Sequence, residues 1–220
     1  SVTNYELHKG LWSGHNDHNY FEIAHTMRRL QGLCHDTRLY NFSDNHDVER
    51  LPNKLRNREH IRHIALLVYT LWGVPSIYYG SEFGIEGKKE WGSDWPLRPC
   101  LDLADFKDAE TTNPVTSVYA ALGRLKAAEP ALTWGEFKEL HLTTQCYAYA
   151  RVLDGEALVA VLNNGDTPAQ LEFQLPVEAS AAEDLLADTV GAQPVMTSFD
   201  WGRMKVQLPS NYATLLRLKK

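Results

Sequence analysis

The residues best suited to chemistry lie in a polar cluster that follows a short aromatic run. Residues 38–42 (Arg-Leu-Tyr-Asn-Phe) are typical of a short strand, and Asn45, His46 and Asp47 follow closely. An imidazole and a carboxylate at the end of a parallel strand present a donor and an acceptor that suit two vicinal hydroxyls of a sugar ring. The tripeptide is equally compatible with turn and capping residues before the next helix. On these residues alone both interpretations stay open.

A second polar segment follows the next strand-like stretch. Residues 74–79 (Val-Pro-Ser-Ile-Tyr-Tyr) are typical of a buried strand, and a polar loop of residues 80–112 comes after it. The loop carries Trp91, Asp94, Trp95 and Arg98. A loop of this length in a compact domain is usually functional. The tryptophans either stack on sugar rings or fill the loop's own apolar core, and burial is the default for aromatic side chains.

The elements that must position these residues alternate between strand and helix patterns up to about residue 130. Strand patterns cover residues 2–7, 38–42 and 74–79, and helix patterns cover residues 20–31, 58–72 and a stretch from 113 onward. This βαβαβα order predicts a parallel sheet with helices on its faces. From Glu136 onward the apolar segments are short, and Asp154-Gly155 is a strong hairpin signal. The second part is therefore predicted to be an antiparallel sandwich.

Two of these segments together resemble landmarks of the alpha-amylase family of glycoside hydrolases. Phe42 and the Asn45-His46-Asp47 tripeptide are similar to the family's phenylalanine-led Asn-His-Asp motif at the end of the seventh barrel strand. Residues 73–84 (Gly-Val-Pro-Ser-Ile-Tyr-Tyr-Gly-Ser-Glu-Phe-Gly) resemble its eighth strand. The order and the spacing of the two segments match, and the resemblance extends over nearly all 220 residues.

The resemblance implies an α/β fold: the C-terminal part of a (β/α)8 TIM barrel in residues 1–130, then an all-β sandwich domain in residues 131–220. It implies a retaining glycoside hydrolase that acts on α-glucosidic bonds of starch-like oligosaccharides. Asp47 would be the carboxylate that stabilises the transition state. The substrate-binding residues would be Asn45, His46, Trp91, Asp94 and Arg98.

The chain departs from the family pattern at the two residues that do the covalent chemistry. The family's nucleophilic aspartate lies on the fourth strand and its acid/base glutamate on the fifth, whereas this chain resembles the family from the sixth strand onward. Glu82 follows a strand as Asp47 does, but it matches a structural position and not a catalytic one. We therefore expect no activity from the chain alone. We expect the missing half of the barrel, or a second copy of the chain, to cover the open part. The alternative is a non-catalytic carbohydrate-binding or scaffold relative.

Composition narrows the possible partners. The formal net charge of −6 argues against nucleic acid and against a basic membrane anchor, and no apolar run is long enough for a membrane helix. Cys34, Cys100 and Cys146 are scattered, which favours free thiols and a cytoplasmic location. Two histidine pairs, His15 with His18 and His60 with His63, each lack further metal ligands at suitable spacing. We expect neither a metal nor another cofactor.

Overall fold

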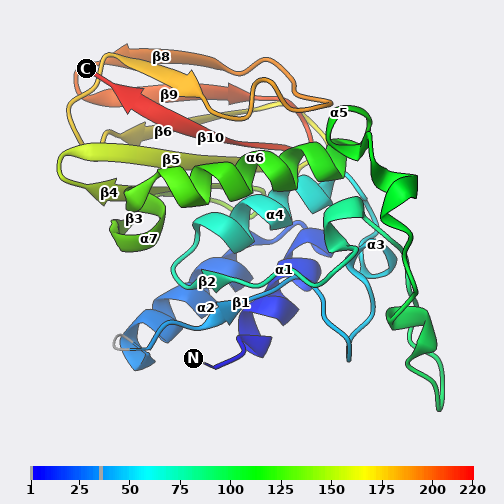
Figure 1. The fold of residues 1–220 in the computed structure, drawn as a ribbon. Coiled ribbons are helices and arrows are strands. Elements are labelled where there is room, and N and C mark those ends of the chain that lie inside the picture. Colours follow the sequence, from blue (N-terminus) through cyan, green and yellow to red (C-terminus); the bar gives the residue numbers. More distant parts are fainter. Residues whose placement is uncertain (1, 35–36) are drawn as a thin grey trace.

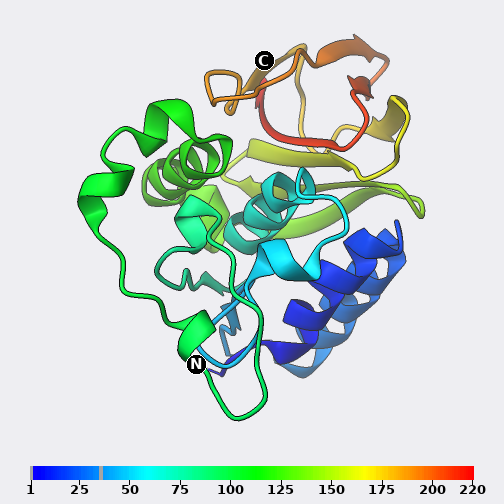
Figure 2. The same ribbon diagram turned by 90° about the vertical axis from the view of Figure 1, so that its right-hand side faces the viewer.

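The computed structural model describes residues 2–34 and 37–220, so Ser1 lies outside the described residues. Helices and a short parallel sheet form one half of the molecule, and antiparallel strands form the other (Figure 1). The α-helices are α1 (Tyr5–Asn16), α2 (Tyr20–Leu33), α3 (Leu51–Lys54), α4 (His60–Thr70), α5 (Ala109–Thr112), α6 (Pro114–Ala128) and α7 (Pro130–Trp134). Figure 2 shows α1 and α2 packed side by side below the antiparallel sheets.

The parallel sheet is short and consists of β1 (Tyr40–Asn41) and β2 (Val74–Pro75), with Thr3 bridged to Tyr40 on the other side of β1. The Asn4 side chain donates to Asn41 Oδ1 at 3.1 Å, and Asn41 in turn donates to the Trp72 carbonyl at 3.0 Å. This row of amides links the three segments edge to edge. Within the described residues these segments form an open row and not a closed barrel.

The expected strand over residues 2–7 is correct only in its first residues. Thr3 does pair in parallel with Tyr40, but α1 begins at Tyr5 because the Asn4 side chain accepts a hydrogen bond from Leu7 N and caps the helix. Leu7 and Leu11 then lie on one buried face of α1. The sequence pattern missed this whole helix, whereas the helices expected near residues 20–31, at 58–72 and from 113 correspond to α2, α4 and α6.

The antiparallel half consists of two sheets. Five strands form one sheet in the order β3-β4-β5-β10-β7, and three form the other in the order β6-β9-β8. The bounds are β3 Glu136–Leu142, β4 Cys146–Leu153, β5 Glu156–Asn163, β6 Ala169–Gln174, β7 Ala181–Asp184, β8 Met196–Asp200, β9 Arg203–Leu208 and β10 Tyr212–Lys219. Asp154 (φ 51°) and Gly155 (φ 80°) join β4 to β5, which confirms the predicted hairpin turn.

Apolar side chains from the two halves form one continuous core. One face of the five-stranded sheet packs on the three-stranded sheet. Its other face, which includes Tyr147, Tyr149 and Leu215, packs against the helices. The buried Arg151 extends this contact, because its guanidinium donates to the carbonyls of Thr70 and Gly135, each at 2.9 Å. The antiparallel half therefore supports the helices that carry the parallel strands.

Candidate active site

The Asn-His-Asp cluster lies in the turn that follows β1. The Asn45 side-chain oxygen accepts hydrogen bonds from Asp47 N (2.8 Å) and Val48 N (3.2 Å), and its amide donates to Tyr5 Oη at 3.3 Å. Asn45 thus shapes the turn, in agreement with the interpretation of these residues as turn residues. The turn leaves His46 and Asp47 about half exposed, with 55% and 50% of their side-chain surface in contact with solvent. Asn45 therefore builds the turn, and the turn exposes the side chains of His46 and Asp47.

Four of the expected residues form a connected polar chain. His46 Nε2 lies 3.3 Å from Asp47 Oδ2, and the other carboxylate oxygen of Asp47 lies 3.5 Å from Arg98 Nη2. Arg98 also contacts Asp94 Oδ2 at 3.1 Å and donates from Nε to the His46 carbonyl at 3.3 Å. Exposed ion pairs contribute little stability. They bring two carboxylates and an imidazole together at one surface.

The tryptophans of the long loop point to solvent. Trp91 is completely exposed (103%) at the tip of a turn that closes between Glu90 and Ser93, and Trp95 is 80% exposed. The expectation that they fill the loop's own core is wrong, because both side chains lie at the surface of the molecule. Lys89 donates to the Asp47 carbonyl at 2.9 Å, so the loop is tied to the Asn-His-Asp turn close to Trp91.

Behind the exposed residues lies a buried polar layer that sequence analysis did not identify. The Asp44 carboxylate is 1% exposed and accepts hydrogen bonds from Ser81 Oγ and from Leu51 N (2.9 Å). Burial raises the pKa of Asp44, while these hydrogen bonds and the nearby Arg50 charge act against that rise. Arg50 is fully buried against the Tyr78 ring, with its guanidinium carbon 4.2 Å from the ring centroid. The only sequence signal for this layer is its place beside the motif.

Glu82 lies apart from the polar chain. It belongs to the 3-10 turn Ser81–Phe83, which packs on α6, and its backbone carbonyl accepts from Thr116 Oγ1 at 2.8 Å. One carboxylate oxygen of Glu82 is buried without a hydrogen-bond partner. Among the described residues, no hydrogen bond or ion pair joins Glu82 to Asp47. Glu82 therefore does not belong to the polar chain formed by His46, Asp47, Asp94 and Arg98.

The two histidine pairs come together in a buried cluster. The ring centroids of His15, His60 and His63 lie 5.1–5.5 Å apart, and the His18 ring lies 5.8 Å from that of His60. Each ring bonds to protein atoms. His60 Nε2 lies 2.7 Å from Asn211 Oδ1, and His63 Nε2 lies 3.0 Å from the Asn163 carbonyl. Over residues 2–34 and 37–220, no group of three or more His, Cys, Asp or Glu is arranged to hold a metal ion. The cluster instead joins α1 and α4 to the antiparallel half.

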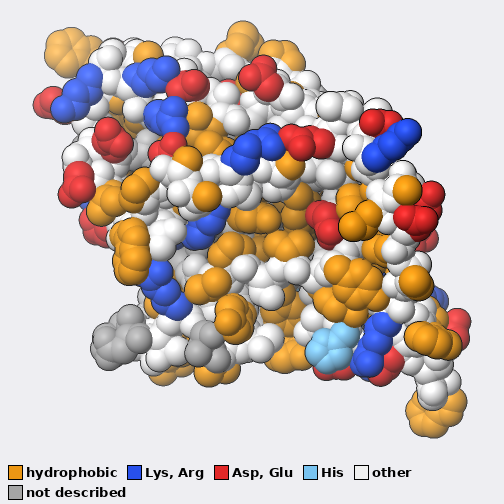
Figure 3. All heavy atoms as spheres, viewed as in Figure 1, with side chains coloured by type: hydrophobic (Ala, Val, Ile, Leu, Met, Phe, Trp, Pro, Cys, Tyr) orange, Lys and Arg blue, Asp and Glu red, His pale blue; other side chains and the backbone are white. Residues whose placement is uncertain are grey.

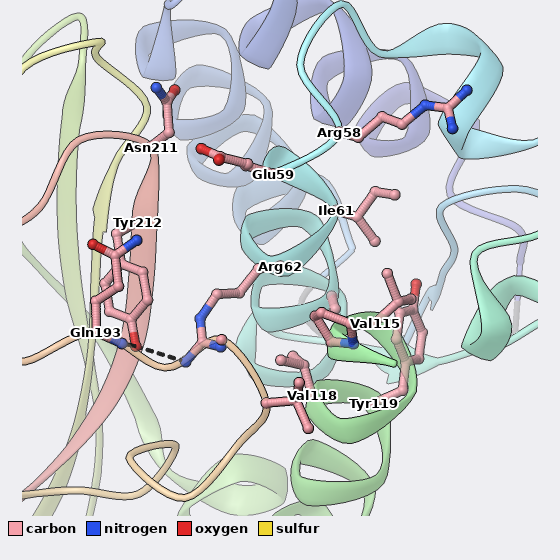
Figure 4. Close-up of a pocket in the computed structure, with 14 residues that line it drawn as sticks. Arg58, Glu59, Ile61, Arg62, Val115, Val118, Tyr119, Gln193, Asn211 and Tyr212 are labelled. Carbon is pink, nitrogen blue, oxygen red and sulfur yellow. Dashed lines mark hydrogen bonds between the residues drawn. The ribbon is translucent and has the colours of Figure 1, made fainter. Parts of the chain in front are cut away.

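A cavity separate from the Asn-His-Asp turn lies where the two halves of the molecule meet. It has a volume of about 230 Å³ and lies between α4, α6 and β10 (Figure 4). Arg62 crosses it and donates to Tyr212 Oη at 2.9 Å and to the Ala213 carbonyl at 2.7 Å. Val118 and Tyr119 line the opposite wall (Figure 4). Its position marks the seam between the two halves of the molecule.

Comparison with known proteins identifies the family of the chain. The model of the alpha-amylase catalytic domain family matches residues 4–147, which is more than half of the chain. The chain belongs to the alpha-amylase family of glycoside hydrolases. The match includes the Asn-His-Asp turn, the second strand and the long loop, so the motif resemblance and its implied fold are confirmed.

Relatives of this alpha-amylase family chain agree over most of its length. A cyclomaltodextrinase of Bacillus sp. is 31% identical over 129 residues, which are 57% of this chain and 22% of that protein. The alpha-amylase of H. orenii superposes with a TM-score of 0.79 at 18% identity, covering 99% of this chain and 48% of that one. A cyclomaltodextrin glucanotransferase with a three-domain ABC distribution gives 0.83 at 20% identity, covering 100% of this chain and 45% of that one.

These superpositions show the fold: the C-terminal part of a TIM barrel followed by a β domain. The chain spans less than half the length of each solved relative and about a fifth of the curated cyclomaltodextrinase. None of the described helices of this family member is both long and apolar enough to cross a membrane.

Proposed function

We propose that this chain forms one wall of a site for α-glucans, the substrate class of a glycoside hydrolase that cleaves α-glucosidic bonds. The observation that carries the proposal is the Asp47 carboxylate, held between the His46 imidazole at 3.3 Å and the Arg98 guanidinium at 3.5 Å. The neighbours named cyclomaltodextrinase and cyclomaltodextrin glucanotransferase support the same substrate class. Hydrolysis and glycosyl transfer are both represented among these names.

Each residue has a distinct role in the proposal. Asp47 and His46 bind two vicinal hydroxyls of one sugar ring, and the Asp47 contact strengthens as the ring flattens towards an oxocarbenium ion. Arg98 and Asp94 fix the orientation of Asp47 and bind the next sugar through their free hydrogen-bonding atoms. Trp91 offers a rigid apolar face for a sugar ring further along the substrate. Asn45 keeps the turn in shape and offers the remaining amide hydrogen.

We propose that the nucleophile and the acid/base come from protein outside these 220 residues. Retaining cleavage needs two carboxyl groups about 5–5.5 Å apart across the scissile bond. Asp94, the carboxylate that shares Arg98 with Asp47, is itself exposed and ion-paired, which suits binding better than proton donation. The alternative of a non-catalytic, sugar-binding relative differs only in whether that outside part carries both catalytic groups.

The open parallel row points to where that outside part attaches. In the parallel row, Thr3 and β2 each pair with β1 on one side. Among the described residues, neither pairs with another strand on its other side. Val2 and Tyr40 are 62% and 42% exposed next to them. Hydrophobic side chains also gather in the recessed middle of the face in Figure 3, between α6 and β2. We propose that further barrel strands, or a second copy of the chain, cover this region.

We also propose a domain boundary near Pro130, with residues 1–130 as barrel and residues 131–220 as the β domain. The change from helices to antiparallel strands at β3 supports it. Buried side chains of both parts share one core, so each part is expected to stabilise the other.

The test of the proposed function uses the purified 220-residue chain with maltooligosaccharides and with an aryl α-glucoside. The expected result is sugar binding without turnover above background. Turnover that disappears in Asp47→Ala would overturn the assignment of the nucleophile and acid/base to protein outside this chain. Absence of any sugar binding would overturn the proposed site.

A further inference from the structure

The structure assigns Arg50 as a positioning residue that clamps the base of the loop carrying Trp91 and Asp94, and thereby holds Arg98 against Asp47. Arg50 follows the Asn-His-Asp turn by three residues and is fully buried, which is unusual for an arginine. Its side chain touches neither His46 nor Asp47 in the described contacts. Its effect on the site must therefore pass through the backbone that it binds.

The guanidinium of Arg50 holds two backbone points that are 18 residues apart. Nη1 donates to the Tyr79 carbonyl at 2.9 Å, and Nη2 donates to the Leu97 carbonyl at 2.9 Å. Nη1 also lies 3.4 Å from Ser81 Oγ. Tyr79 lies just before the long loop, and Leu97 lies just after residues 88–95, the part of the loop that extends into solvent. One side chain thus joins the two sides of the loop.

The backbone of Arg50 binds the same loop at a third point. Arg50 N donates to the Gly87 carbonyl at 2.9 Å. Gly87 in turn is packed so tightly that a Cβ there would lie 2.4 Å from the Pro96 carbonyl oxygen and 2.8 Å from Arg50 Cγ. Gly87 and Pro96 therefore meet over Arg50, and the segment of residues 88–95 between them projects to solvent from this closed base. Only glycine permits so close an approach.

The clamp ends one residue away from the proposed sugar site. Leu97 is followed by Arg98, which contacts the His46 carbonyl, Asp47 Oδ1 and Asp94 Oδ2. The Arg98 side chain is 42% exposed, so solvent weakens its ion pairs with Asp47 and Asp94, and these pairs alone do not fix the Arg98 backbone. The buried bond from Arg50 to the Leu97 carbonyl does so. In this respect the inference rests on the proposed function, since it explains how that site keeps its shape.

Only an arginine suits this position. A lysine would keep the positive charge but lacks the rigid fork in which two separate nitrogens bond the carbonyls of Tyr79 and Leu97. The flat guanidinium also stacks on the Tyr78 ring. Its charge is balanced within the buried layer, because Ser81 Oγ joins the guanidinium to the buried Asp44 carboxylate. Arg50→Lys is therefore the variant that removes the clamp and keeps the charge.

The experiment compares amide hydrogen exchange by mass spectrometry in the wild type, Arg50→Lys and Arg62→Lys. Arg62 is the control, because it is a partly buried arginine that also bonds to several groups, but at the seam between the two halves. Both variants are expected to lower overall stability. Only Arg50→Lys is expected to accelerate exchange in residues 85–98 selectively, by roughly tenfold, as the loss of local hydrogen bonds predicts. Equal exchange of residues 85–98 in the two variants would overturn the clamp.

Two additions keep the test decisive. If Arg50→Lys does not fold, Gly87→Ala replaces it, because the added methyl group pushes Pro96 away from Arg50 and should give the same local acceleration. Maltoheptaose binding is measured on the same samples, and Arg50→Lys should weaken it at least threefold more than Arg62→Lys does. A wild type that binds no maltoheptaose would refute the proposed function, while the exchange data would still decide the clamp. Equal weakening by both variants would refute the positioning role.

Discussion

Acidification should destabilise this fold through its buried histidines, and His63 gives the clearest case. Its side chain is completely buried, and burial is the main reason that its pKa falls from 6.5 to about 3, with the neighbouring His60 acting in the same direction. The carbonyls of Asn163 and Glu59 oppose the fall. Arg62 and His15 are the other titratable groups beside it. His63 is therefore neutral in the folded protein at pH 5.

The sign of the effect follows from the two pKa values. Below pH 6.5 the unfolded chain binds a proton at His63 that the folded protein does not bind until the pH approaches 3. The contribution of neutral His63 to the free energy of unfolding is therefore fully present above pH 6.5 and is lost as the pH falls towards 3. Between pH 7 and pH 5 the loss from this one residue is about 2 kcal/mol. Burial also lowers the pKa of His8, to about 4, so a second contribution of similar size is expected.

The assay is urea unfolding followed by circular dichroism at pH 7 and at pH 5. His63→Gln removes the titrating group, and its amide can still donate to the Asn163 carbonyl. Between pH 7 and pH 5, the free energy of unfolding should fall by about 2 kcal/mol less in His63→Gln than in the wild type, whatever the stability of the variant at pH 7. Ile64→Val is the control, since it weakens the core of the same helix without a titratable group. An equal loss in His63→Gln and the wild type would refute the reasoning.

Three further predictions concern single positions. Gly73→Ala should destabilise the fold by on the order of 3 kcal/mol in urea unfolding, because Gly73 has φ +134° and a Cβ would lie 2.6 Å from Asn41 Nδ2. Gly123→Ala, in the open middle of α6, should be neutral or stabilising, and a similar loss at both glycines would count against this account. Trp91→Ala should weaken maltoheptaose binding about fivefold in calorimetry and leave the melting temperature unchanged. Trp201 is similarly exposed but lies far along the chain in the β domain, and Trp201→Ala should leave both the binding and the melting temperature unchanged. In a complete catalytic domain, Asp47→Asn should lower kcat by on the order of 100-fold with little change in KM, whereas a raised KM at constant kcat would make Asp47 a plain binding residue.

The parts of the site that the sequence predicts are those in which adjacent residues act together. The Asn-His-Asp turn works as a local unit, because the Asn45 side chain accepts hydrogen bonds from the backbone of Asp47 and Val48 and so presents His46 and Asp47. The hairpin at Asp154-Gly155 is local for the same reason, since its φ values suit these two residue types. Both were predicted from the residues alone.

The parts that sequence analysis missed depend on contacts between distant residues. The strand pattern of residues 2–7 hid α1, whose start depends on the Asn4 side chain being shared between Leu7 N and Asn41. The burial of Arg50 depends on acceptors at Tyr79 and Leu97, which no local pattern reveals. The histidine cluster and β7 (Ala181–Asp184) were missed for the same reason, since each is completed by partners far along the chain.

The most direct test of the account is a calorimetric titration of maltoheptaose into the 220-residue chain and two single-charge variants. Asp47→Ala removes the carboxylate between His46 and Arg98. Asp200→Ala makes the same charge change at an exposed position in the antiparallel half. The account predicts binding with a Kd on the order of 1 mM, weakened about tenfold by Asp47→Ala and unchanged by Asp200→Ala. Equal affinity in all three proteins, or no binding by the wild type at about 10 mM sugar, a concentration ten times that Kd, would contradict it.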